Sequence, residues 1–328
     1  MSRFAVIGTN WITDRFIEAA SYHKDFKLEA VYSRTEERAK NFAEKHHIPA
    51  IFTDLDELAR SDLFEAVYIA SPNSFHAEQA ILLMNHGKHI LCEKPLASNL
   101  REIQAMIDAA NANHVFLMEA LYTTCLPNFL AIKSNLHRLG PIRRYVANYG
   151  KISSRYDAYR EGTILNAFNP AFSNGSLMDL GVYGVYPMVA LFGPPNAIKA
   201  NGFLLESGVD GQGSVIASYD GMEGVVMHSK ISDSHLPSEI QGEEGTLVID
   251  LISNPEKVHI QWRDGRVESL SQKHEFPSMY YEAAEFMSCI REGKTDSQLN
   301  SLKTSHTTAV VLEEARRQMG LIYPADQK

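Results

Sequence analysis

The stretch FAVIGTNWIT, residues 4–13, joins a short apolar run to a loop and then to a helical pattern. An apolar strand that ends in glycine and leads into a helix is the opening unit of a dinucleotide-binding sheet, whose loop reads G-x-G-x-x-G. Here Gly8 holds the first glycine position, whereas Asn10 and Thr13 hold the other two. The stretch therefore predicts a strand, a loop and a helix, and leaves open whether the loop binds a phosphate or is a plain turn.

The two replaced glycines set what this loop can do. In the glycine pattern the second glycine lets the backbone approach a pyrophosphate, and the third lets the helix pack closely on the strand. Asparagine tolerates left-handed backbone angles, so we expect Asn10 to stand in for the second glycine in that conformation. We expect Thr13 either to loosen the contact between helix and strand or to cap the helix. If the loop binds a dinucleotide, its expected contacts are Gly8, Thr9, Asn10, Trp11 and Ile12.

Beyond the loop, the first third of the chain alternates strand-like and helical patterns. The expected strands are residues 4–7, 28–32, 66–69, 89–91 and 115–118. The expected helices between them are residues 11–21, 36–46, 76–86 and 100–112. Strands that alternate with helices indicate βαβ units and a parallel sheet, and the right-handed crossover rule favours a doubly wound sheet.

After residue 120 the pattern changes. The sequence predicts helices at 129–139, 176–191, 279–291 and 301–319, and a strand at 143–149. Between residues 198 and 270 several strand-like runs are separated by turn dipeptides at 210–211, 220–221, 244–245 and 264–265, which indicates an antiparallel sheet. The expected fold class is therefore α/β, with an N-terminal Rossmann domain (residues 1–120). A C-terminal α+β domain (residues 121–328) follows, with a large open, mainly antiparallel sheet.

Composition excludes several classes of partner. The 328 residues suit two domains, and 45% apolar with 22% charged residues is typical of a globular protein. A net charge of −9 without a basic cluster disfavours nucleic acid. The longest apolar run, residues 182–192, is too short to span a bilayer. The histidines are scattered and the three cysteines have no zinc-type spacing, so we expect no metal site.

The same features indicate where the protein works. The first strand begins directly after residues 1–3, which favours a chain without a signal peptide. Cys92, Cys125 and Cys289 are odd in number and far apart, as reduced thiols of a cytosolic protein are. We therefore expect a cytoplasmic protein.

The end of the second expected strand bears on the choice between NAD and NADP. NAD-binding domains carry an acidic residue there for the ribose 2′-hydroxyl, but here Glu29 lies mid-strand. Ser33, Arg34 and Arg38 follow the strand, and guanidinium groups match the geometry of phosphate. These residues favour NADP over NAD. The alternative is that both arginines are solvated charges at the start of a helix.

Two further motifs directly follow expected strands, where ligands bind in open α/β sheets. Residues 70–76 read ASPNSFH and residues 92–96 read CEKPL. We expect cofactor contacts from Ser71, Pro72, Asn73 and His76 of the first motif and from Glu93 and Lys94 of the second. His76 could equally cap or pack the next helix, and Lys94 could be a surface lysine in a turn.

S-P-N-x-x-H at 71–76, E-K-P at 93–95 and M-D-x-G-x-Y at 178–183, in this order, resemble the Gfo/Idh/MocA oxidoreductases, including glucose–fructose oxidoreductase and inositol dehydrogenase. The resemblance covers nearly the whole chain. It implies NAD(P)-dependent hydride transfer at a hydroxyl or carbonyl group of a sugar, polyol or vicinal diol. It also implies a homodimer or higher homo-oligomer through the C-terminal sheet, and a cis peptide before Pro95. Tyrosine stands where inositol dehydrogenases have histidine, which favours the branch of the dihydrodiol dehydrogenases.

The resemblance also implies catalytic roles. A hydroxyl that is oxidised must lose a proton as its carbon loses a hydride, so an acid or base must lie near it. By analogy with relatives we expect Tyr183 to transfer this proton and Lys94 to activate the phenol, because an ammonium group favours the phenolate. Asp179 lies four residues before Tyr183 in an expected helix and would bind the substrate or Lys94. The alternative for Tyr183 is an aromatic residue of the core.

One departure from the family concerns the substrate. Relatives of this branch follow M-E-A (residues 118–120 here) with an aromatic residue and then an arginine, whereas this chain has Tyr122 and Thr124. We expect Tyr122, Arg155, Asp179 and Tyr183 to contact the substrate. Two other functions stay open on the same scaffold, a nucleotide-binding sensor without turnover and an NAD-dependent glycosidase. The intact Lys94 disfavours the sensor.

Overall fold

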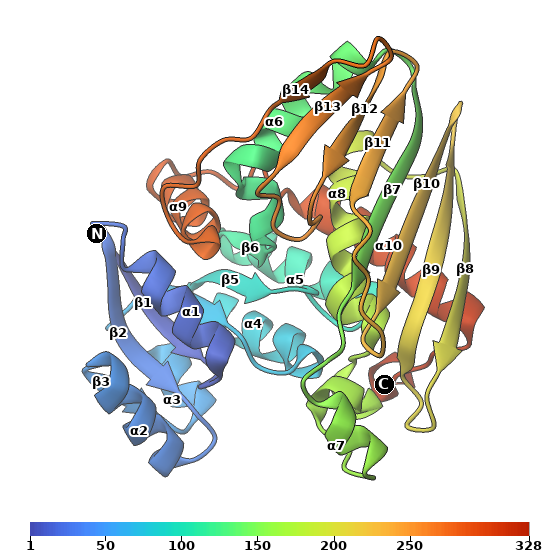
Figure 1. Ribbon diagram of the computed structural model, residues 1–328. Helices are drawn as coiled ribbons and strands as arrows, with labels where there is room; N and C mark the ends of the chain where they lie inside the picture. The colour runs from blue at the N-terminus through green and yellow to red at the C-terminus, as the bar shows by residue number, and fades with distance from the viewer. Residues whose placement is uncertain (328) are drawn as a thin grey trace. The chain divides into compact units, whose positions relative to one another are not determined.

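The computed structural model describes residues 1–327 and divides the chain into two compact units (Figure 1). The first unit consists of Met1–Tyr122 and Phe276–Leu302, and the second of Thr123–Glu275 and the residues from Lys303 onward. The sequence pattern places a single boundary after residue 120. The structure differs from it, because Phe276–Leu302 returns to the first unit.

The first unit is built on a parallel sheet of six strands in the order β3-β2-β1-β4-β5-β6. Its strands are β1 (Ser2–Ile7), β2 (Phe26–Tyr32), β3 (Ala50–Phe52), β4 (Ala66–Ile69), β5 (His89–Glu93) and β6 (Leu117–Ala120). The strand order reverses between β1 and β4, and ligands of open α/β sheets bind outside the carboxyl ends at such a reversal. The expected doubly wound sheet is confirmed.

Helices of this unit connect the strands. They are α1 (Trp11–Ala20), α2 (Glu36–His46), α3 (Leu55–Arg60), α4 (His76–Met84), α5 (Leu100–Asn113) and α9 (Ser278–Arg291), with a 3₁₀ turn at Asn73–Phe75. The sequence pattern does not predict β3 or α3, because three and six residues are too few to display a period.

Aromatic packing explains why α9 belongs to the first unit. The Phe286 ring lies 5.8 Å from the ring of Phe4 in β1 and 5.5 Å from that of Phe116. Ala283 and Met279, one and two turns earlier on the same helix, are buried in the same core cluster. Spacing of this kind gives a helix one apolar face, which is buried here against the parallel sheet. The segment is therefore part of the core of the first unit.

The second unit is built on an eight-stranded sheet in the order β14-β13-β12-β11-β7-β10-β9-β8. Its strands are β7 (Ile142–Gly150), β8 (Ala197–Leu204), β9 (Asp210–Tyr219), β10 (Met222–Ser229), β11 (Ser238–Gly242), β12 (Gly245–Ile249), β13 (Val258–Trp262) and β14 (Val267–Ser269). Only β7 and β10 pair in parallel; the other neighbours are antiparallel, as expected.

One expected turn is wrong. Asp210 and Gly211 are the first residues of β9, and the chain reverses before them at Gly208, which has a φ of +89°. The dipeptides at 220–221 and 264–265 do lie between paired strands, and at 244–245 Glu244 lies in the turn while Gly245 begins β12. A dipeptide of this type indicates a turn only where the flanking residues can pair. Here Asp210 is buried and accepts a hydrogen bond from the backbone N–H of Leu177.

Helices of this unit precede, connect and follow the strands. They are α6 (Pro127–Asn135), α7 (Tyr156–Arg160), α8 (Val182–Phe192) and α10 (Leu302–Met319), and a π-helical turn, Leu177–Gly181, leads directly into α8. Shorter 3₁₀ turns occur at Tyr122–Cys125, Leu136–Leu139, Asn166–Phe168, Pro170–Phe172 and Pro324–Gln327.

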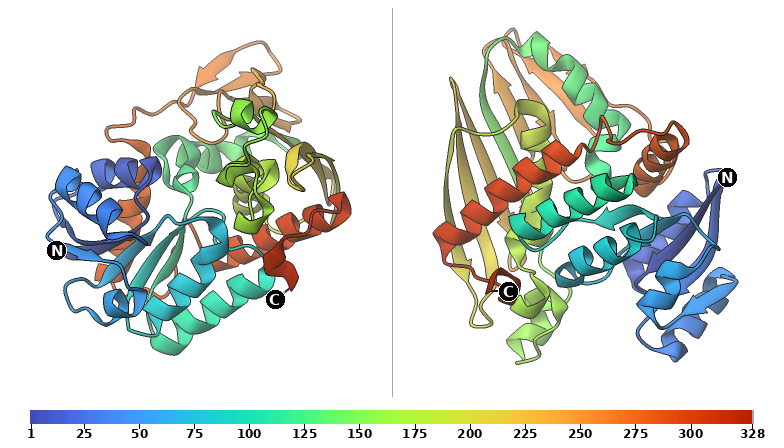
Figure 2. Two further views of the ribbon diagram at one scale, coloured as in Figure 1. Left: turned by 90° about the horizontal axis from the view of Figure 1, so that it is seen from below. Right: turned by 180° about the vertical axis from the view of Figure 1, so that it is seen from behind.

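The registers of the strands place α8 and α10 on the same face. The backbone of α8 at Gly184 faces Val226 of β10, and Met319 of α10 faces Gly202 of β8. Gly202 pairs with Gly213, which pairs with His228, so this row shares the face of Val226. Figure 2 shows α10 crossing the strands on this side.

By length and composition alone, Pro170–Phe192 could cross a membrane, although residues 182–192 could not. Of its most apolar window, 67% is buried inside the protein. The stretch is also interrupted by the π-helical turn. A buried, apolar helix of this kind is typical of a core helix that packs on a sheet.

Candidate active site

Gly8 begins the expected nucleotide-binding loop, at a position where no other amino acid fits. Gly8 follows β1 with a φ of +105°, in the region that side chains disfavour. A Cβ at this position would lie 2.7 Å from the carbonyl oxygen of Ala70, the residue after β4. Both the backbone angle and the neighbouring strand therefore require glycine, as the sequence pattern predicts for the first position of the loop.

Asn10 does not replace a glycine in the expected manner. Its φ of −110° is extended rather than left-handed, and it is the N-cap of α1. Its Oδ1 accepts hydrogen bonds from the backbone N–H of Ile12 (3.0 Å) and Thr13 (3.3 Å), and its Nδ2 donates to the carbonyl of Ala70 at 2.7 Å. The expectation of a left-handed Asn10 is wrong, because the side chain shapes the loop through hydrogen bonds instead.

Thr13 does not cap the helix, since Asn10 does. Thr13 is fully buried on α1, and its hydroxyl has no hydrogen-bond partner within residues 1–327. Of the two adjoining loop residues, Trp11 is 59% exposed and Ile12 packs against the core cluster of the first unit. The exposed residues of the loop are therefore Asn10 and Trp11, and Thr9 beside them is half-buried.

A pocket of about 280 Å³ opens beside this loop. It is lined by Thr9, Arg38, Asn41, Phe42 and Lys45. Lys45 is paired with Asp14 at 2.8 Å, so its charge is already compensated. Within residues 1–327, neither Arg34 nor Arg38 has a carboxylate partner. The pocket therefore presents an uncompensated guanidinium group next to the loop, as a phosphate site requires.

The end of β2 departs from the NAD pattern, as expected. Glu29 forms an ion pair with Lys27 at 2.6 Å within the strand. Ser33 is buried and donates its backbone N–H to the carbonyl of Phe52 at 3.1 Å. Arg34 is exposed. No acidic residue directly follows this strand, where an acceptor for a ribose 2′-hydroxyl would lie.

His76 joins the two motifs that follow β4 and β5. It is fully buried, and its Nδ1 and Nε2 lie 3.1 Å from the carbonyl oxygen of Pro95 and 2.9 Å from that of Ser71. Burial is the main cause that lowers the pKa of His76 below its ordinary value. A neutral imidazole carries a single N–H, so it donates a hydrogen bond to one of these two carbonyls while the ring packs between both loops. The contact of this loop with the cofactor stays a prediction.

The loop of residues 70–76 is itself held in place. The Ser71 hydroxyl donates to Gln79 Oε1 of α4 at 2.7 Å, and Asn73 is buried at the start of the 3₁₀ turn. Pro72 precedes that turn with a ψ of 145°, so the chain is extended there. The motif therefore forms a fixed wall at the carboxyl end of β4, where the reversal of strand order places ligands.

The E-K-P motif forms a cis turn at the end of β5. The Lys94–Pro95 peptide is cis, as the resemblance implies. Glu93 is buried; it accepts a hydrogen bond from the Tyr68 hydroxyl at 2.5 Å and one from the backbone N–H of Lys94 at 3.2 Å. The backbone N–H of Leu96 donates to Glu119 Oε1 at 3.0 Å. Glu93 thus supports the turn from inside and holds the backbone of Lys94.

A third buried glutamate lies near this turn. Glu282 of α9 is fully buried, and neither of its carboxyl oxygens has a hydrogen-bond partner within residues 1–327. Burial, and then the charge of Glu93, raise the pKa of Glu282 well above its ordinary value. The environment therefore favours its neutral form. Sequence reasoning missed this residue because it lies in an otherwise ordinary amphipathic helix.

In the second unit, Asp179 and Tyr183 flank the end of the π-helical turn. Asp179 lies within the turn and Tyr183 is the second residue of α8. Tyr183 is 9% exposed, and its ring lies 5.7 Å from that of Tyr149 in β7 at a steep angle. π-helical turns inside helices occur frequently at functional sites. The motif M-D-x-G-x-Y thus forms the irregular start of the most buried helix of this unit.

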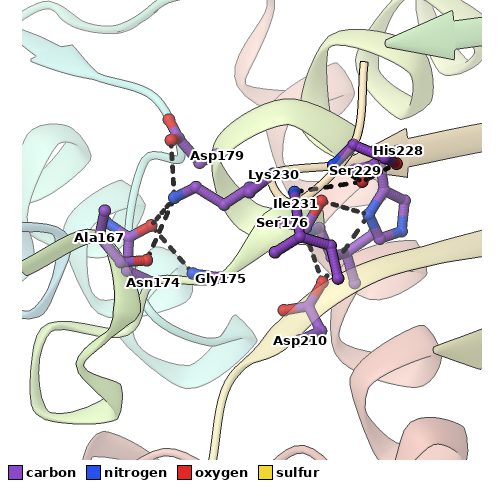
Figure 3. A network of polar contacts seen from close by, with 12 residues as sticks. Ala167, Asn174, Gly175, Ser176, Asp179, Asp210, His228, Ser229, Lys230 and Ile231 are labelled. Atoms are coloured by element: carbon purple, nitrogen blue, oxygen red, sulfur yellow. Dashed lines mark hydrogen bonds and ion pairs between the residues drawn. The ribbon is translucent and has the colours of Figure 1, made fainter. Parts of the chain in front are cut away.

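Asp179 has a partner that sequence reasoning missed. Lys230, the residue after β10, places its Nζ 2.9 Å from Asp179 Oδ2 (Figure 3). Its ammonium group also donates to the carbonyl of Ala167 and to Asn174 Oδ1, each at 3.1 Å. Lys230 is 1% exposed. A lone lysine at the end of a strand gives no signal in the sequence, because it reads as a surface residue.

A second buried group holds the start of the same helix. Asp210 of β9 accepts a hydrogen bond from the backbone N–H of Leu177 at 2.6 Å, and His228 Nδ1 lies 2.9 Å from the Ser176 hydroxyl. Burial raises the pKa of Asp210 to about 6 and lowers that of His228 to about 3. Gly175 has a φ of +143°, and a Cβ there would collide with Asp210 Oδ1.

The loop after β7 carries Arg155, an expected substrate contact, beside two packed tyrosines. Tyr156 and Tyr159 of α7 pack on Phe168, with ring centroids 5.8 and 5.1 Å away. They therefore belong to a small core cluster. Arg155 is exposed beside them. Thr124, at the position of the relatives' arginine, is buried.

Tyr122 packs partly buried against the core of the first unit. Among the described residues, no group of three or more histidine, cysteine, aspartate or glutamate side chains could hold a metal ion. The first unit thus has a glycine loop beside a basic pocket and a lysine on a fixed turn, and the second has a tyrosine and a carboxylate on an irregular helix. These are the features that the motifs predict for an NAD(P)-dependent oxidoreductase.

Comparisons with known proteins identify the family. Residues 2–121 match the oxidoreductase family with an NAD-binding Rossmann fold, and residues 137–248 match the GFO/IDH/MocA C-terminal domain. The chain belongs to the Gfo/Idh/MocA family of oxidoreductases, as the motifs predict.

Two curated relatives and one solved structure illustrate the match. The chain is 61% identical over 327 residues, 100% of both chains, to scyllo-inositol 2-dehydrogenase (NADP(+)) IolU of Bacillus subtilis (strain 168). It is 30% identical to trans-1,2-dihydrobenzene-1,2-diol dehydrogenase of Xenopus laevis, over 98% of this chain and 99% of that one. The structure of KijD10, a 3-ketoreductase from Actinomadura kijaniata, with NADP and TDP-benzene, has a TM-score of 0.84. It is 21% identical and covers 97% of this chain and 98% of that one. A tyrosine at position 183 thus does not separate this chain from inositol dehydrogenases.

Proposed function

We propose that this chain catalyses the reversible, NADP-dependent oxidation of a secondary hydroxyl group of an inositol-like cyclic polyol to the ketone. The observation that carries the proposal is the 61% identity, along the entire chain, to a scyllo-inositol 2-dehydrogenase that uses NADP(+). The relative at 30% identity is named for a vicinal diol on a six-membered ring. Both names describe a ring with adjacent hydroxyl groups, so such rings are the substrate class to test.

The residues of the first unit fit NADP. Gly8 keeps its side of the loop clear at the end of β1, where a Cβ would reach the backbone of Ala70. The pocket beside Thr9 offers Arg38, and Arg34 is exposed nearby in the sequence without an ion pair within residues 1–327. Guanidinium groups bind a 2′-phosphate by paired, charge-assisted hydrogen bonds. We assign both arginines to the 2′-phosphate.

The nicotinamide ring of the bound cofactor supplies the hydride chemistry. The protein must then move the proton of the reacting hydroxyl group. We assign this proton to the hydroxyl of Tyr183 and the activation of that phenol to Lys94, whose backbone is held by Glu93. Asp179 accepts a hydrogen bond from a substrate hydroxyl and orients the ring. Tyr122 and Arg155 are proposed as further substrate contacts.

The sheet of the second unit has an open face suited to self-association. The face opposite α8 carries Val146, Ile216, Val225 and Met227, of which Ile216 is 43% exposed, and Phe203 on the same face is 57% exposed. Exposed apolar side chains over several strands mark interaction sites. We propose that two copies associate through this face.

The three cysteines are buried and form no disulfide, which suits the cytoplasm.

The test is a spectrophotometric assay of the purified chain with a panel of inositols, sugars and vicinal diols. An NADP-dependent dehydrogenase produces NADPH with at least one inositol, and NAD supports the reaction less well. Tyr183→Phe and Lys94→Ala are expected to lower kcat by roughly a hundredfold or more while NADPH still binds. Bound cofactor without any net change in absorbance across the panel, in either direction, would instead indicate a sensor or a glycosidase.

A further inference from the structure

Lys230 is a buried lysine whose ammonium group is completely satisfied. It contacts three oxygens, namely Asp179 Oδ2 at 2.9 Å, the carbonyl of Ala167 at 3.1 Å and Asn174 Oδ1 at 3.1 Å. An ammonium group has three hydrogens to donate, so each oxygen can receive one. The Nζ also lies 5.4 Å from the centroid of the Phe168 ring. Three oxygen acceptors therefore compensate the burial of the Lys230 ammonium group.

The other end of this contact is only partly buried. Asp179 is 36% exposed at its side chain, whereas the side chain of Lys230 is 2% exposed. A buried charge must be paired, so the carboxylate and the ammonium group depend on each other. Figure 3 shows the lysine reaching from the sheet to Asp179. The partly exposed carboxylate of Asp179 is thus paired with the buried ammonium group of Lys230.

The surrounding backbone limits how far this pair can move. The backbone N–H of Lys230 donates to the carbonyl of Gly211 at 2.8 Å, which ties it to β9. On the helix side, Asp210 receives the backbone N–H of Leu177, two residues before Asp179. Lys230 and the turn that carries Asp179 are therefore both attached to β9. The position of Asp179 is fixed through its backbone and through its side chain.

We infer that Lys230 is a positioning residue that keeps Asp179 ionised and aimed as a hydrogen-bond acceptor for a substrate hydroxyl. The part that concerns substrate rests on the proposed function. Lys230 acts through Asp179 and does not itself transfer a proton, because its three hydrogens are used and it is 1% exposed. The Lys230→Met variant, which has a similar length without the charge, should release the carboxylate.

The first experiment follows the side-chain carboxyl of Asp179 by NMR with carboxyl-labelled aspartate, identified by its loss in Asp179→Asn. In Lys230→Met its midpoint should rise by about one pH unit or more, because an adjacent cation favours the carboxylate by that amount. In Lys230→Arg the midpoint should stay near that of the parent. Other titratable groups on elements that pack against the turn remain in all variants; they are Asp210, His228, Tyr149 and Tyr183. An unchanged midpoint in Lys230→Met overturns the inference.

The second experiment measures kcat/KM against pH with the best polyol of the panel. The acid limb for Lys230→Met should shift upward by about one unit or more and KM should rise, while the Kd for NADPH stays within about twofold. The matched control is Lys88→Met in the first unit. Lys88 is 6% exposed, donates to the carbonyls of Ser61 and Phe64, and lies 5.1 Å from the Phe64 ring, but within residues 1–327 it forms no ion pair with a carboxylate. It should leave the pH profile unchanged.

The outcomes separate the two proposals. A shifted Asp179 midpoint without turnover of any polyol by the parent protein would refute the proposed function and leave the Lys230 contact standing. Turnover by the parent with identical pH profiles for parent and Lys230→Met would refute the inference alone. If Lys230→Met does not fold, the double variant Lys230→Met with Asp179→Asn removes both charges. It should recover folding, because a buried pair is less costly to remove than to break.

Discussion

The side-chain amide of Asn10 lies 2.7 Å from the carbonyl oxygen of Ala70, sixty residues further along the chain. The same side chain caps α1 through Ile12 and Thr13. One asparagine therefore connects the nucleotide-binding loop to the end of β4. In the usual loop the second glycine adopts backbone angles that other residues disfavour. In this chain the side chain of Asn10 shapes the loop instead, through the helix cap and the hydrogen bond to Ala70.

The first prediction concerns this cap. Asn10→Ala should lower the free energy of unfolding by about 1 kcal/mol and weaken NADPH binding, since both the cap and the bond to Ala70 are lost. Urea unfolding and NADPH fluorescence titration measure the two effects. Asp54→Ala removes the N-cap of α3, where Asp54 accepts from Glu57 N–H at 2.9 Å, and should lower only stability. Equal NADPH affinity in the Asn10→Ala and parent proteins would contradict a role for this side chain in the loop.

Gly8→Ala should damage the loop more severely. The new methyl group would lie 2.7 Å from the carbonyl oxygen of Ala70, at a φ of +105°. Backbone angles of this kind cost about 1–3 kcal/mol for a side-chain-bearing residue, and the clash adds to it. We expect a clear loss of thermal stability and of NADPH binding. Gly87→Ala, at a φ of +75° with open space around it, shares the angle without the clash and should retain NADPH binding.

Cofactor preference tests the basic pocket. Arg38→Ala should raise the Kd for NADPH roughly tenfold or more, because a hydrogen bond to a charged group contributes about 1.5–3 kcal/mol, and leave the Kd for NADH nearly unchanged. Arg34→Ala should act in the same direction. Arg60→Ala on α3, where the side chain is 66% exposed, is the matched control. Parallel losses of NADPH and NADH in Arg38→Ala would argue for a general structural effect instead.

The parts of the fold that the sequence predicts are those with a strong period or a strict local requirement. The parallel strands, the long helices and Gly8 belong to this group. The residue type of Asn10 permits a left-handed angle, but the structure has an extended residue that caps α1 through Ile12 and Thr13 and donates to Ala70, which is distant in sequence. The same limit explains why Asp210-Gly211 reads as a turn although Asp210 is a buried partner of Leu177.

The site is predicted less completely than the fold. Lys94, Asp179 and Tyr183 stand out because motifs mark them. Lys230 and Glu282 do not, since a single charged residue at a strand end or on an amphipathic helix is ordinarily solvent-exposed. Their burial results from packing between segments far apart in the chain, which local patterns do not encode.

Asp210 should give stability a specific pH dependence. Burial raises its pKa from 3.8 to about 6, so the folded protein binds this proton more tightly than the unfolded chain. Its stabilising contribution is therefore complete below about pH 4 and is lost as pH rises through about 6. Asp210→Asn keeps an acceptor for the Leu177 N–H but carries no charge. In denaturant unfolding between pH 4 and 7.5, the free energy of unfolding of Asp210→Asn should increase relative to that of the parent as pH rises. A constant difference between the two free energies would contradict this assignment.

The central claim is that the chain transfers a hydride from a ring carbon of a cyclic polyol to NADP. It is tested most directly with scyllo-inositol carrying deuterium on its ring carbons, incubated with NADP and the purified protein, followed by mass spectrometry of the cofactor. The account predicts NADPH that carries one deuterium per turnover, with the label lost in Lys94→Ala because turnover stops. Reduced cofactor without deuterium, or no reduced cofactor with any inositol, would contradict it.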